Sequence, residues 1–283
     1  MPALTPGTLA ELVDGGQAFR WQREPDDTWL GIWAEHVVRL RMNSNGGLEW
    51  SAPEALAARV RTALPLYLFG HDTATAVDAL PWRSDTHLAR CLNAFSGLTI
   101  LRQPFGETLL GFLCSATKQI VQIKQMIALL AQRHGAPLAG TNSLHRLPTW
   151  PELATASEIE LRACLLGFRA RYIHQTAQFI AANPGWLEAT EAAPYAEAKA
   201  RLMTLPGVGA KVADCVLLFG AGKLEAFPVD TWIIKAMARR YALDEWTPEQ
   251  VAHFGRMHFG TFAGLAQQYL FAYERAYGKT VSP

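Results

Sequence analysis

The chain has 283 residues, half of them hydrophobic, and its 26 basic and 25 acidic side chains leave a net charge of +1. This composition is typical of a globular protein with room for two domains, and it excludes a disordered or strongly basic chain. Any contact with nucleic acid must therefore come from local patches, turn amides and helix ends. Binding of that kind is expected to depend only weakly on salt.

The cysteines and histidines do not indicate a metal site. The four cysteines form no CxxC pair, and the eight histidines show no HExxH spacing. We expect Cys91, Cys114 and Cys164 to be small buried side chains in a reducing compartment, and His253 and His258 to lie on helix surfaces. The amino terminus lacks a signal-peptide pattern and no apolar run could span a bilayer, so an intracellular, soluble protein without a membrane partner is expected.

The first third of the chain predicts an antiparallel sheet of hairpins. Short β-branched or aromatic stretches alternate there with turn signals, such as the Asn-Ser-Asn-Gly-Gly cluster at residues 43–47. The expected strands are residues 18–22, 29–33, 37–42 and 48–50. From Pro53 onward the pattern is helical almost throughout.

The helical part begins with an expected long helix that has Pro104 in its first turn and runs to Ile127. Further helices are expected at residues 151–165, 172–182, 231–241, 247–257 and 264–277. The fold class is therefore α+β, with an antiparallel β-sheet domain over residues 1–99 and a larger all-α body over residues 100–283.

The run Leu-Pro-Gly-Val-Gly-Ala-Lys at residues 205–211 is the most informative segment for function. Its glycines and proline supply a compact turn between helices expected at residues 195–205 and 210–219. This pattern predicts a helix-hairpin-helix over about residues 195–220. Amides at the start of its second helix would suit a phosphate, so the contacts to a nucleic-acid backbone are expected from Gly207, Val208 and Gly209.

Lys211 follows this turn directly, and Asp230 comes nineteen residues later (230 minus 211). A carboxylate can stabilise positive charge on a sugar while its glycosidic bond breaks, and an amine can capture the sugar carbon as a Schiff base. The amine attacks only when it is neutral, a form favoured by partial desolvation in the first turn of a helix. Alternatively, Lys211 is a solvated helix residue or makes a simple contact with phosphate. Asp230 could instead be the N-cap of the helix that starts at Thr231, or it could be both the cap and a catalytic residue.

Five ordered blocks of sequence resemble the 8-oxoguanine DNA glycosylases of the helix-hairpin-helix superfamily. They are GQAFRW at residues 16–21, LRQ at 101–103, GFRARY at 167–172, KVADC at 211–215 with PVD at 228–230, and AGLAQ at 263–267 with Phe271. The resemblance implies a bifunctional DNA glycosylase and apurinic-site lyase that excises oxidised purines, chiefly 8-oxoguanine, from damaged duplex DNA in base excision repair. It also implies a monomer that needs no cofactor, with Lys211 as the Schiff-base nucleophile and Asp230 in the electrostatic and acid–base role. The hairpin carbonyls in such proteins can hold a monovalent cation without requiring one.

The same resemblance assigns residues that recognise the flipped base. Phe271 and Cys215 would sandwich it, and Gln267 would read its Watson–Crick edge. The backbone carbonyl of Gly16 would accept a hydrogen bond from N7–H, a proton that oxidised guanine carries and guanine lacks. Alternatively, Phe271 and Cys215 belong to the core, Gln267 is a polar surface residue, and Gly16 only ends a helix before a strand.

The chain departs from the family pattern where the opposite strand is read. Thr117 stands where the gap-filling asparagine is expected, and Gln122 stands in place of the first cytosine-reading arginine. Arg169 matches the second arginine of the family pattern, and Phe168 retains an aromatic wedge in place of the family's tyrosine. Since glutamine lacks the rigid donor fork of arginine, we expect a weaker preference for cytosine opposite the lesion. Trp232 also replaces a histidine that contacts phosphate in the family, so the resemblance does not carry that contact over to this chain.

Two other functions stay open from the sequence. The diverged reader residues would also suit a glycosylase that removes an alkylated or otherwise altered base. A non-catalytic DNA-binding module would use the hairpin for phosphates alone. The presence of Lys211 together with Asp230 argues against that module, because binding alone needs neither.

Overall fold

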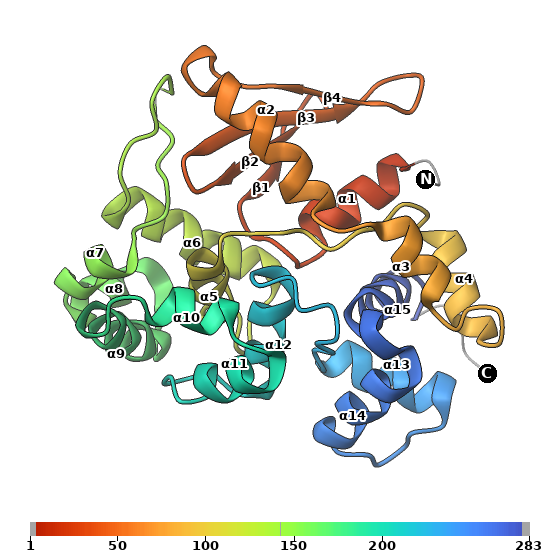
Figure 1. Ribbon diagram of the computed structural model, residues 1–283. Coiled ribbons are helices and arrows are strands. Elements are labelled where there is room, and N and C mark those ends of the chain that lie inside the picture. Colours follow the sequence, from red (N-terminus) through yellow and green to blue (C-terminus); the bar gives the residue numbers. More distant parts are fainter. Residues whose placement is uncertain (1–3, 142, 279–283) are drawn as a thin grey trace.

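The computed structural model describes residues 4–141 and 143–278, which form a small sheet domain and a larger helical body (Figure 1). The four strands are β1 (Trp21–Arg23), β2 (Trp29–Trp33), β3 (His36–Met42) and β4 (Leu48–Ser51). They pair in the order β1-β2-β3-β4, each antiparallel to its neighbour. The predicted α+β class and sheet of hairpins are confirmed, although β1 begins three residues later than expected (21 minus 18).

Helix α2 (Glu54–Phe69) covers one face of this sheet (Figure 1). Aromatic side chains join the helix to the sheet. The ring of Trp33 stacks on Tyr67 of α2 at 4.3 Å between centroids, and Trp21 Nε1 donates a hydrogen bond to Tyr67 Oη at 3.0 Å. Buried indole and phenol groups need such partners, so this contact orients the sheet on the helix.

The other helices build the body below the sheet. They are α1 (Pro6–Asp14), α3 (Thr73–Ala79), α4 (Thr86–Ala94), α5 (Phe105–Leu113), α6 (Ile120–His134), α7 (Trp150–Thr155), α8 (Glu158–Leu161), α9 (Arg169–Ala182), α10 (Trp186–Ala192), α11 (Tyr195–Leu202), α12 (Ala210–Phe219), α13 (Thr231–Tyr241), α14 (Pro248–Phe259) and α15 (Ala263–Tyr277), with a π turn η1 (Arg162–Leu166) and a 3₁₀ turn η2 (Gly260–Phe262). Helices α5 to α11 lie on one side of α12, and α3, α4, α13, α14 and α15 lie on the other (Figure 1). Helix α4 packs against α15 although it precedes residue 99, so the domain boundary at residues 99 and 100 stays a prediction.

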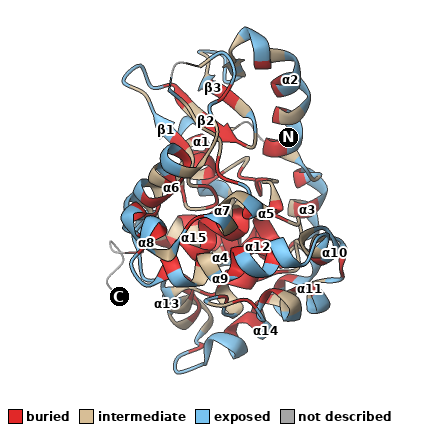
Figure 2. Ribbon diagram, turned by 90° about the vertical axis from the view of Figure 1, so that its left-hand side faces the viewer, coloured by how far each residue is buried: buried red, intermediate tan, exposed pale blue. Residues whose placement is uncertain are grey.

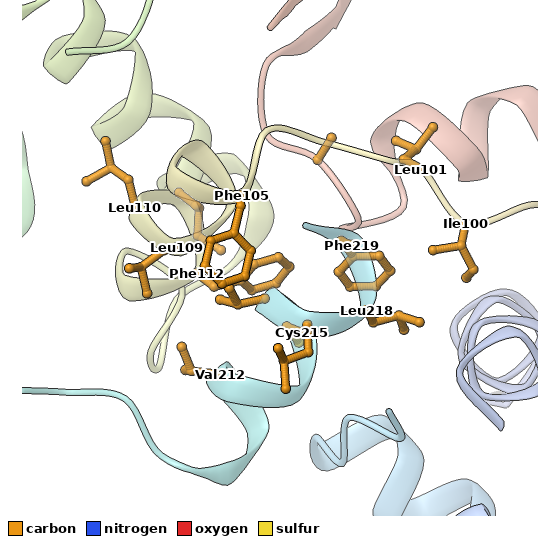
Figure 3. Close-up of a cluster of buried hydrophobic side chains, with 14 of the residues drawn as sticks. Ile100, Leu101, Phe105, Leu109, Leu110, Phe112, Val212, Cys215, Leu218 and Phe219 are labelled. Carbon is orange, nitrogen blue, oxygen red and sulfur yellow. The ribbon is translucent and has the colours of Figure 1, made fainter. Parts of the chain in front are cut away.

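The core runs through the centre of the helical body, where buried residues gather on α12, α15 and α5 (Figure 2). Between α5 and α12 the contact is made mainly by buried apolar side chains (Figure 3). Phe112 of α5 stacks on Phe219 of α12 with 5.6 Å between ring centroids. Close packing of this kind tolerates little displacement, so it fixes α12 and the residues that α12 carries.

The expected single helix from Pro104 to Ile127 is wrong, because α5 ends at Leu113 and α6 starts only at Ile120. Thr117 adopts the left-handed conformation, with φ of +54°, which no helix continues through. Ser115 Oγ donates to the carbonyl of Phe112 at 2.7 Å and closes the end of α5.

The helix expected at residues 151–165 is also divided. Ala156 is extended, and Ser157 Oγ accepts a hydrogen bond from Glu160 N at 3.2 Å, which caps a separate α8. The π turn η1 follows, with Leu165 at φ of +63°. Helix α13 spans the predicted residues, α9 and α15 begin one to three residues earlier than predicted, and α14 begins one residue later.

Cys91, Cys114 and Cys164 are buried free thiols, as predicted. His253 and His258 lie on the surface of α14, and His258 Nε2 contacts Asp85 Oδ2 at 3.1 Å. Within residues 4–141 and 143–278, no helix is both long enough and apolar enough to cross a membrane.

Candidate active site

The predicted helix-hairpin-helix is present as α11, a tight turn and α12. Val208 N donates to Leu205 O at 3.2 Å to close the turn. Gly207 has φ of +80°, and a Cβ atom there would lie 2.5 Å from Tyr172 Cδ2, so only glycine fits. Gly209 is the N-cap of α12 and offers no capping side chain. The first amides of α12 are therefore left for a ligand, and the helix dipole favours an anion.

Lys211 lies in the first turn of α12 and is half-buried. Its Nζ atom lies 5.1 Å from the centroid of the Phe112 ring on α5. Its charge also acts on Cys215 and on Asp230, because it partly offsets the rise that burial causes in the pKa of each group. The structure thus brings together the two residues that the sequence predicted for catalysis.

Asp230 caps α13 and faces the lysine at the same time. Its Oδ1 accepts hydrogen bonds from Trp232 N at 3.0 Å and Ile233 N at 2.9 Å. Burial raises the pKa of this carboxyl above its ordinary value, while the two amides and Lys211 oppose the rise. The predicted N-cap is therefore confirmed, and the carboxylate is also placed to stabilise positive charge near Lys211.

Cys215 lies one turn beyond Lys211 on α12 and is buried. Burial raises the pKa of its thiol to about 11, so the side chain is a neutral thiol at physiological pH. A neutral sulfur at this depth offers a polarisable, apolar contact surface to a neighbouring ring.

Gln267 and Phe271 lie four residues apart on α15, which places them on one side of the helix. Gln267 is only 3% exposed, so the alternative of a polar surface residue is wrong. Its Nε2 donates to Pro228 O at 3.0 Å, and its Oε1 accepts from Gln268 Nε2 at 2.7 Å. These bonds tie α15 to the segment that leads into Asp230. Phe271 is partly buried and packs on the core.

Gly16 has φ of +106°, a conformation that favours glycine, and a Cβ atom there would lie 3.3 Å from Ile120 Cδ1. The next residue anchors this backbone from three directions. Gln17 Nε2 donates to Thr99 O at 2.9 Å, Gln17 Oε1 accepts from Leu101 N at 2.9 Å, and Gln17 O accepts from Gln103 Nε2 at 2.7 Å. These three bonds hold the amino-terminal segment against residues 99–103, the stretch that leads into α5.

The residues predicted to read the opposite strand fall into two sets. Thr117, Gln122 and Phe168 are exposed, and Phe168 is 50% exposed. Arg169 is only 2% exposed. Its guanidinium donates to Ala116 O, to Thr117 Oγ1 at 3.2 Å and to Leu166 O at 3.2 Å. Arg169 thus holds the loop before α6, and its contact with DNA stays a prediction.

Three residues that position the site were not singled out individually from the sequence. Phe112 lies in an apolar run that gives no sign of its contact with Lys211. Tyr172 and Gln17 both belong to the blocks that carried the family resemblance, which was the only signal for them.

Trp232 is half-buried in the first turn of α13, with Lys235 Nζ 5.7 Å from its ring centroid. Among the residues that the structure describes, no group of three histidine, cysteine or acidic side chains is placed to hold a metal.

A sheet domain followed by a helix-hairpin-helix body, with a lysine and an aspartate at its centre, defines the class as a base excision DNA repair glycosylase. The chain matches the family described as HhH-GPD superfamily base excision DNA repair protein over residues 110–256, and the 8-oxoguanine DNA glycosylase N-terminal domain over residues 5–109. These two matches cover most of the chain. It therefore belongs to the 8-oxoguanine DNA glycosylase family and is a DNA N-glycosylase with lyase activity.

Individual relatives agree with this membership. An N-glycosylase/DNA lyase OGG1 of Arabidopsis thaliana is 30% identical over 97% of this chain and 79% of its own length. The solved structure of the Clostridium acetobutylicum 8-oxoguanine glycosylase/lyase, bound to double-stranded DNA with cytosine opposite 8-oxoguanine, superposes with a TM-score of 0.88 at 30% identity. That similarity covers 98% of this chain and 94% of the other. A 3-methyladenine DNA glycosylase from Archaeoglobus fulgidus has a TM-score of 0.74 at 22% identity and covers 97% of this chain and 96% of its own, which shows a shared fold only.

Proposed function

We propose that this protein binds damaged duplex DNA, flips an oxidised purine out of the stack and excises it, with 8-oxoguanine as the chief substrate. The observation that carries the proposal is the placement of Lys211 between Phe112, Cys215 and Asp230. An amine and a carboxylate that share a partly buried site suit glycosidic cleavage, whereas phosphate binding alone needs neither.

The reaction would run through a covalent intermediate. The neutral amine of Lys211 attacks the sugar C1′, the glycosidic bond breaks, and the base leaves with the bonding electron pair and takes up a proton. Asp230 stabilises the positive charge that develops on the sugar. The attached nitrogen then loses a proton, the C1′–O4′ bond opens, and a C1′=N imine forms. The imine makes the neighbouring C2′ proton acidic, and removal of that proton allows elimination of the 3′ phosphate. That elimination is the lyase step.

The recognition residues support an oxidised purine. The thiol of Cys215 and the ring of Phe271 would hold the base between them, and the carbonyl of Gly16 would accept the N7–H bond. Gln267 has already used one N–H and one lone pair of its amide on Pro228 and Gln268. The other N–H and the other lone pair remain for the edge of a base.

The DNA backbone would lie against the hairpin amides of Gly207, Val208 and Gly209, with Phe168 and Thr117 near the opposite strand. The family membership and the DNA-bound relative support this arrangement. We expect a monomer that works on DNA inside the cell, by analogy with other small glycosylases.

Borohydride trapping tests the proposal. The wild-type protein is incubated with duplexes that carry 8-oxoguanine, an alkylated purine or an abasic site, and the reduced adduct is resolved on a denaturing gel. We expect an adduct with 8-oxoguanine and with the abasic site, its loss in Lys211→Gln, and its retention in Lys223→Gln as a matched control. An adduct with the alkylated purine but not with 8-oxoguanine would name a different base. No adduct with any of the three would eliminate the Schiff-base mechanism.

A further inference from the structure

Leu165 combines two features that folding alone disfavours. Its backbone has φ of +63° and ψ of 16°, the left-handed region in which an L-residue with a bulky side chain is strained. Its side chain is 60% exposed, so the leucine gains little from burial in return. Strain without a packing benefit points to a role outside the fold.

The neighbours of Leu165 hold this conformation firmly from both sides. Cys164 and Leu166 are completely buried. Arg133 Nη1 of α6 donates to Ala163 O at 2.7 Å, and Arg169 Nη1 of α9 donates to Leu166 O at 3.2 Å. The exposed leucine is therefore displayed on an ordered segment, and it would lose little conformational entropy on meeting a ligand.

This segment is continuous with the proposed DNA surface. Phe168, three residues further on, is also exposed, and its ring packs edge-on against Tyr172 at 5.8 Å. Tyr172 in turn lies against Gly207 in the hairpin turn. On the other side, Arg169 connects the segment to Thr117 in the loop before α6. Phe168 thus stands between the hairpin and the loop that would face the opposite strand, and the exposed Leu165 lies three residues before it on the same segment.

We propose that Leu165 acts with Phe168 as a two-residue apolar wedge that enters the base stack of the bound duplex. The inference rests on the proposed function, because it takes duplex DNA as the occupant of this surface. Apolar side chains inserted between base steps unstack and kink the duplex, which makes a damaged base easier to flip. With a net charge of only +1, the chain as a whole attracts DNA weakly, so insertion would supply part of the hold on DNA.

The test compares substitutions that separate the side chain from the backbone strain. Asparagine tolerates the left-handed region, so Leu165→Asn removes the apolar group without harming the fold, while Leu165→Met keeps it. We expect Leu165→Asn to bind the lesion duplex about tenfold more weakly, in line with the loss of one stacking contact, and Leu165→Met to bind as the wild type does. A 2-aminopurine base placed beside the lesion fluoresces more strongly when it is unstacked from its neighbours. In the complex with Leu165→Asn this fluorescence should be lower than in the complexes with the wild type and with Leu165→Met.

Leu66→Asn is the matched control, because Leu66 lies on α2 with 63% of its surface exposed. It should leave both affinity and fluorescence unchanged. If Leu165→Asn binds the duplex and unstacks its bases as the wild type does, the wedge proposal is overturned. If the wild type itself forms no borohydride adduct, the failure lies in the proposed function and not in the wedge.

Discussion

The Nζ atom of Lys211 lies 5.1 Å from the centroid of the Phe112 ring, and that ring stacks on Phe219, which belongs to the same helix as the lysine. One aromatic side chain of α5 thus contacts both ends of α12. The ring is only 3% exposed and cannot move aside easily, so it restricts the directions in which the amine can point. The packing of α5 against α12 therefore determines the direction in which the nucleophilic amine points.

Phe112→Leu should slow formation of the borohydride-trapped adduct while leaving the protein folded. Leucine fills most of the space at a cost of about 1 kcal/mol, but it gives the amine no flat surface to lie against. We expect single-turnover trapping to slow about tenfold, because small misplacements of a nucleophile are costly. Phe105→Leu at the start of α5 controls for lost packing. An equal loss of rate in both variants would refute the positional role of Phe112.

Asp230→Asn should separate the capping role of this residue from its catalytic role. Asparagine keeps an oxygen that can accept from Trp232 N and Ile233 N, so the melting temperature should hardly change. Loss of the charge should slow excision by about 10²- to 10³-fold. Asp230→Ala should in addition lower the free energy of unfolding by about 1 kcal/mol, through loss of the cap. If Asp230→Asn excises the base at the wild-type rate, Asp230 acts as a helix cap only.

The sequence could predict those elements that local patterns determine. The strands and α12 and α13 follow from residue periodicity and turn residues, and their predicted positions are correct within a few residues. The break between α5 and α6 could not be predicted in this way. Leu113 and Ile120 are seven residues apart, so the apolar period continues across the break. The loop is held there by Arg169, more than fifty residues further along the chain.

The candidate site shows the same division. Lys211 and Asp230 lie close enough for the charge of the lysine to act on the carboxylate, and their shared role in catalysis stays a prediction. The partners of each side chain lie in distant elements and leave no local pattern. Phe112 beside Lys211 and the burial of Arg169 are both of this kind. Long polar side chains are usually exposed, so a buried arginine with backbone partners is seldom inferred from sequence.

Gly207→Ala should destabilise the hairpin far more than Gly209→Ala. A Cβ atom at Gly207 would lie 2.5 Å from Tyr172 Cδ2 on a backbone with positive φ, whereas one at Gly209 would meet no atom within 4 Å. We expect losses of about 2–3 kcal/mol and of under about 1 kcal/mol, respectively, in urea unfolding. Adding Tyr172→Ala to Gly207→Ala should restore part of the difference between the two variants, because it removes the clash. Equal stability of the two glycine variants would contradict the packing seen here.

The preference for the base opposite the lesion should be weak. Gln122 is exposed in the first turn of α6, and its Oε1 accepts from Gln119 N at 3.3 Å, so its amide is partly committed to the helix start. We expect similar excision rates opposite cytosine and adenine in the wild type. Gln122→Arg should favour cytosine by about tenfold, because one bidentate contact contributes about 1–3 kcal/mol of discrimination. Gln125→Arg adds the same charge one turn further along and is the control. A strong cytosine preference in the wild type would contradict the expectation.

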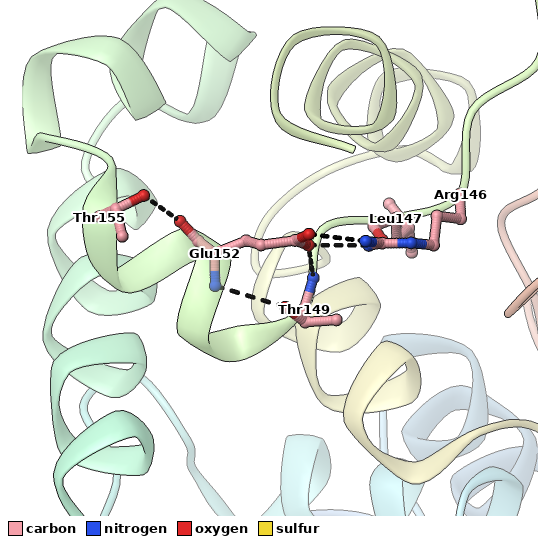
Figure 4. A network of polar contacts seen from close by, with 5 residues as sticks. All are labelled: Arg146, Leu147, Thr149, Glu152 and Thr155. Carbon is pink, nitrogen blue, oxygen red and sulfur yellow. Dashed lines mark hydrogen bonds and ion pairs between the residues drawn. The ribbon is translucent and has the colours of Figure 1, made fainter. Parts of the chain in front are cut away.

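The Arg146 and Glu152 pair should make stability depend on acidity well below neutral pH. The Arg146 guanidinium bonds both oxygens of Glu152 at 2.7 and 2.6 Å, and Thr149 N donates to the same carboxylate at 2.7 Å (Figure 4). The arginine lowers the pKa of Glu152 from 4.5 to about 2. Because the pKa is lowered in the folded state, the stabilisation is present above about pH 4.5 and is lost as the pH falls toward 2.

Glu152→Gln should therefore lower the free energy of unfolding by about 1 kcal/mol at pH 7, a modest value because the carboxylate is partly exposed. The difference from the wild type should shrink when urea unfolding is repeated at pH 3, where the charged carboxylate no longer contributes fully. Glu158→Gln, which breaks an ion pair with Arg162 within one helical turn, is the matched control and should cost under about 0.5 kcal/mol. A Glu152→Gln deficit of the same size at both pH values would show that the side chain stabilises this corner through packing and capping, and not through its charge.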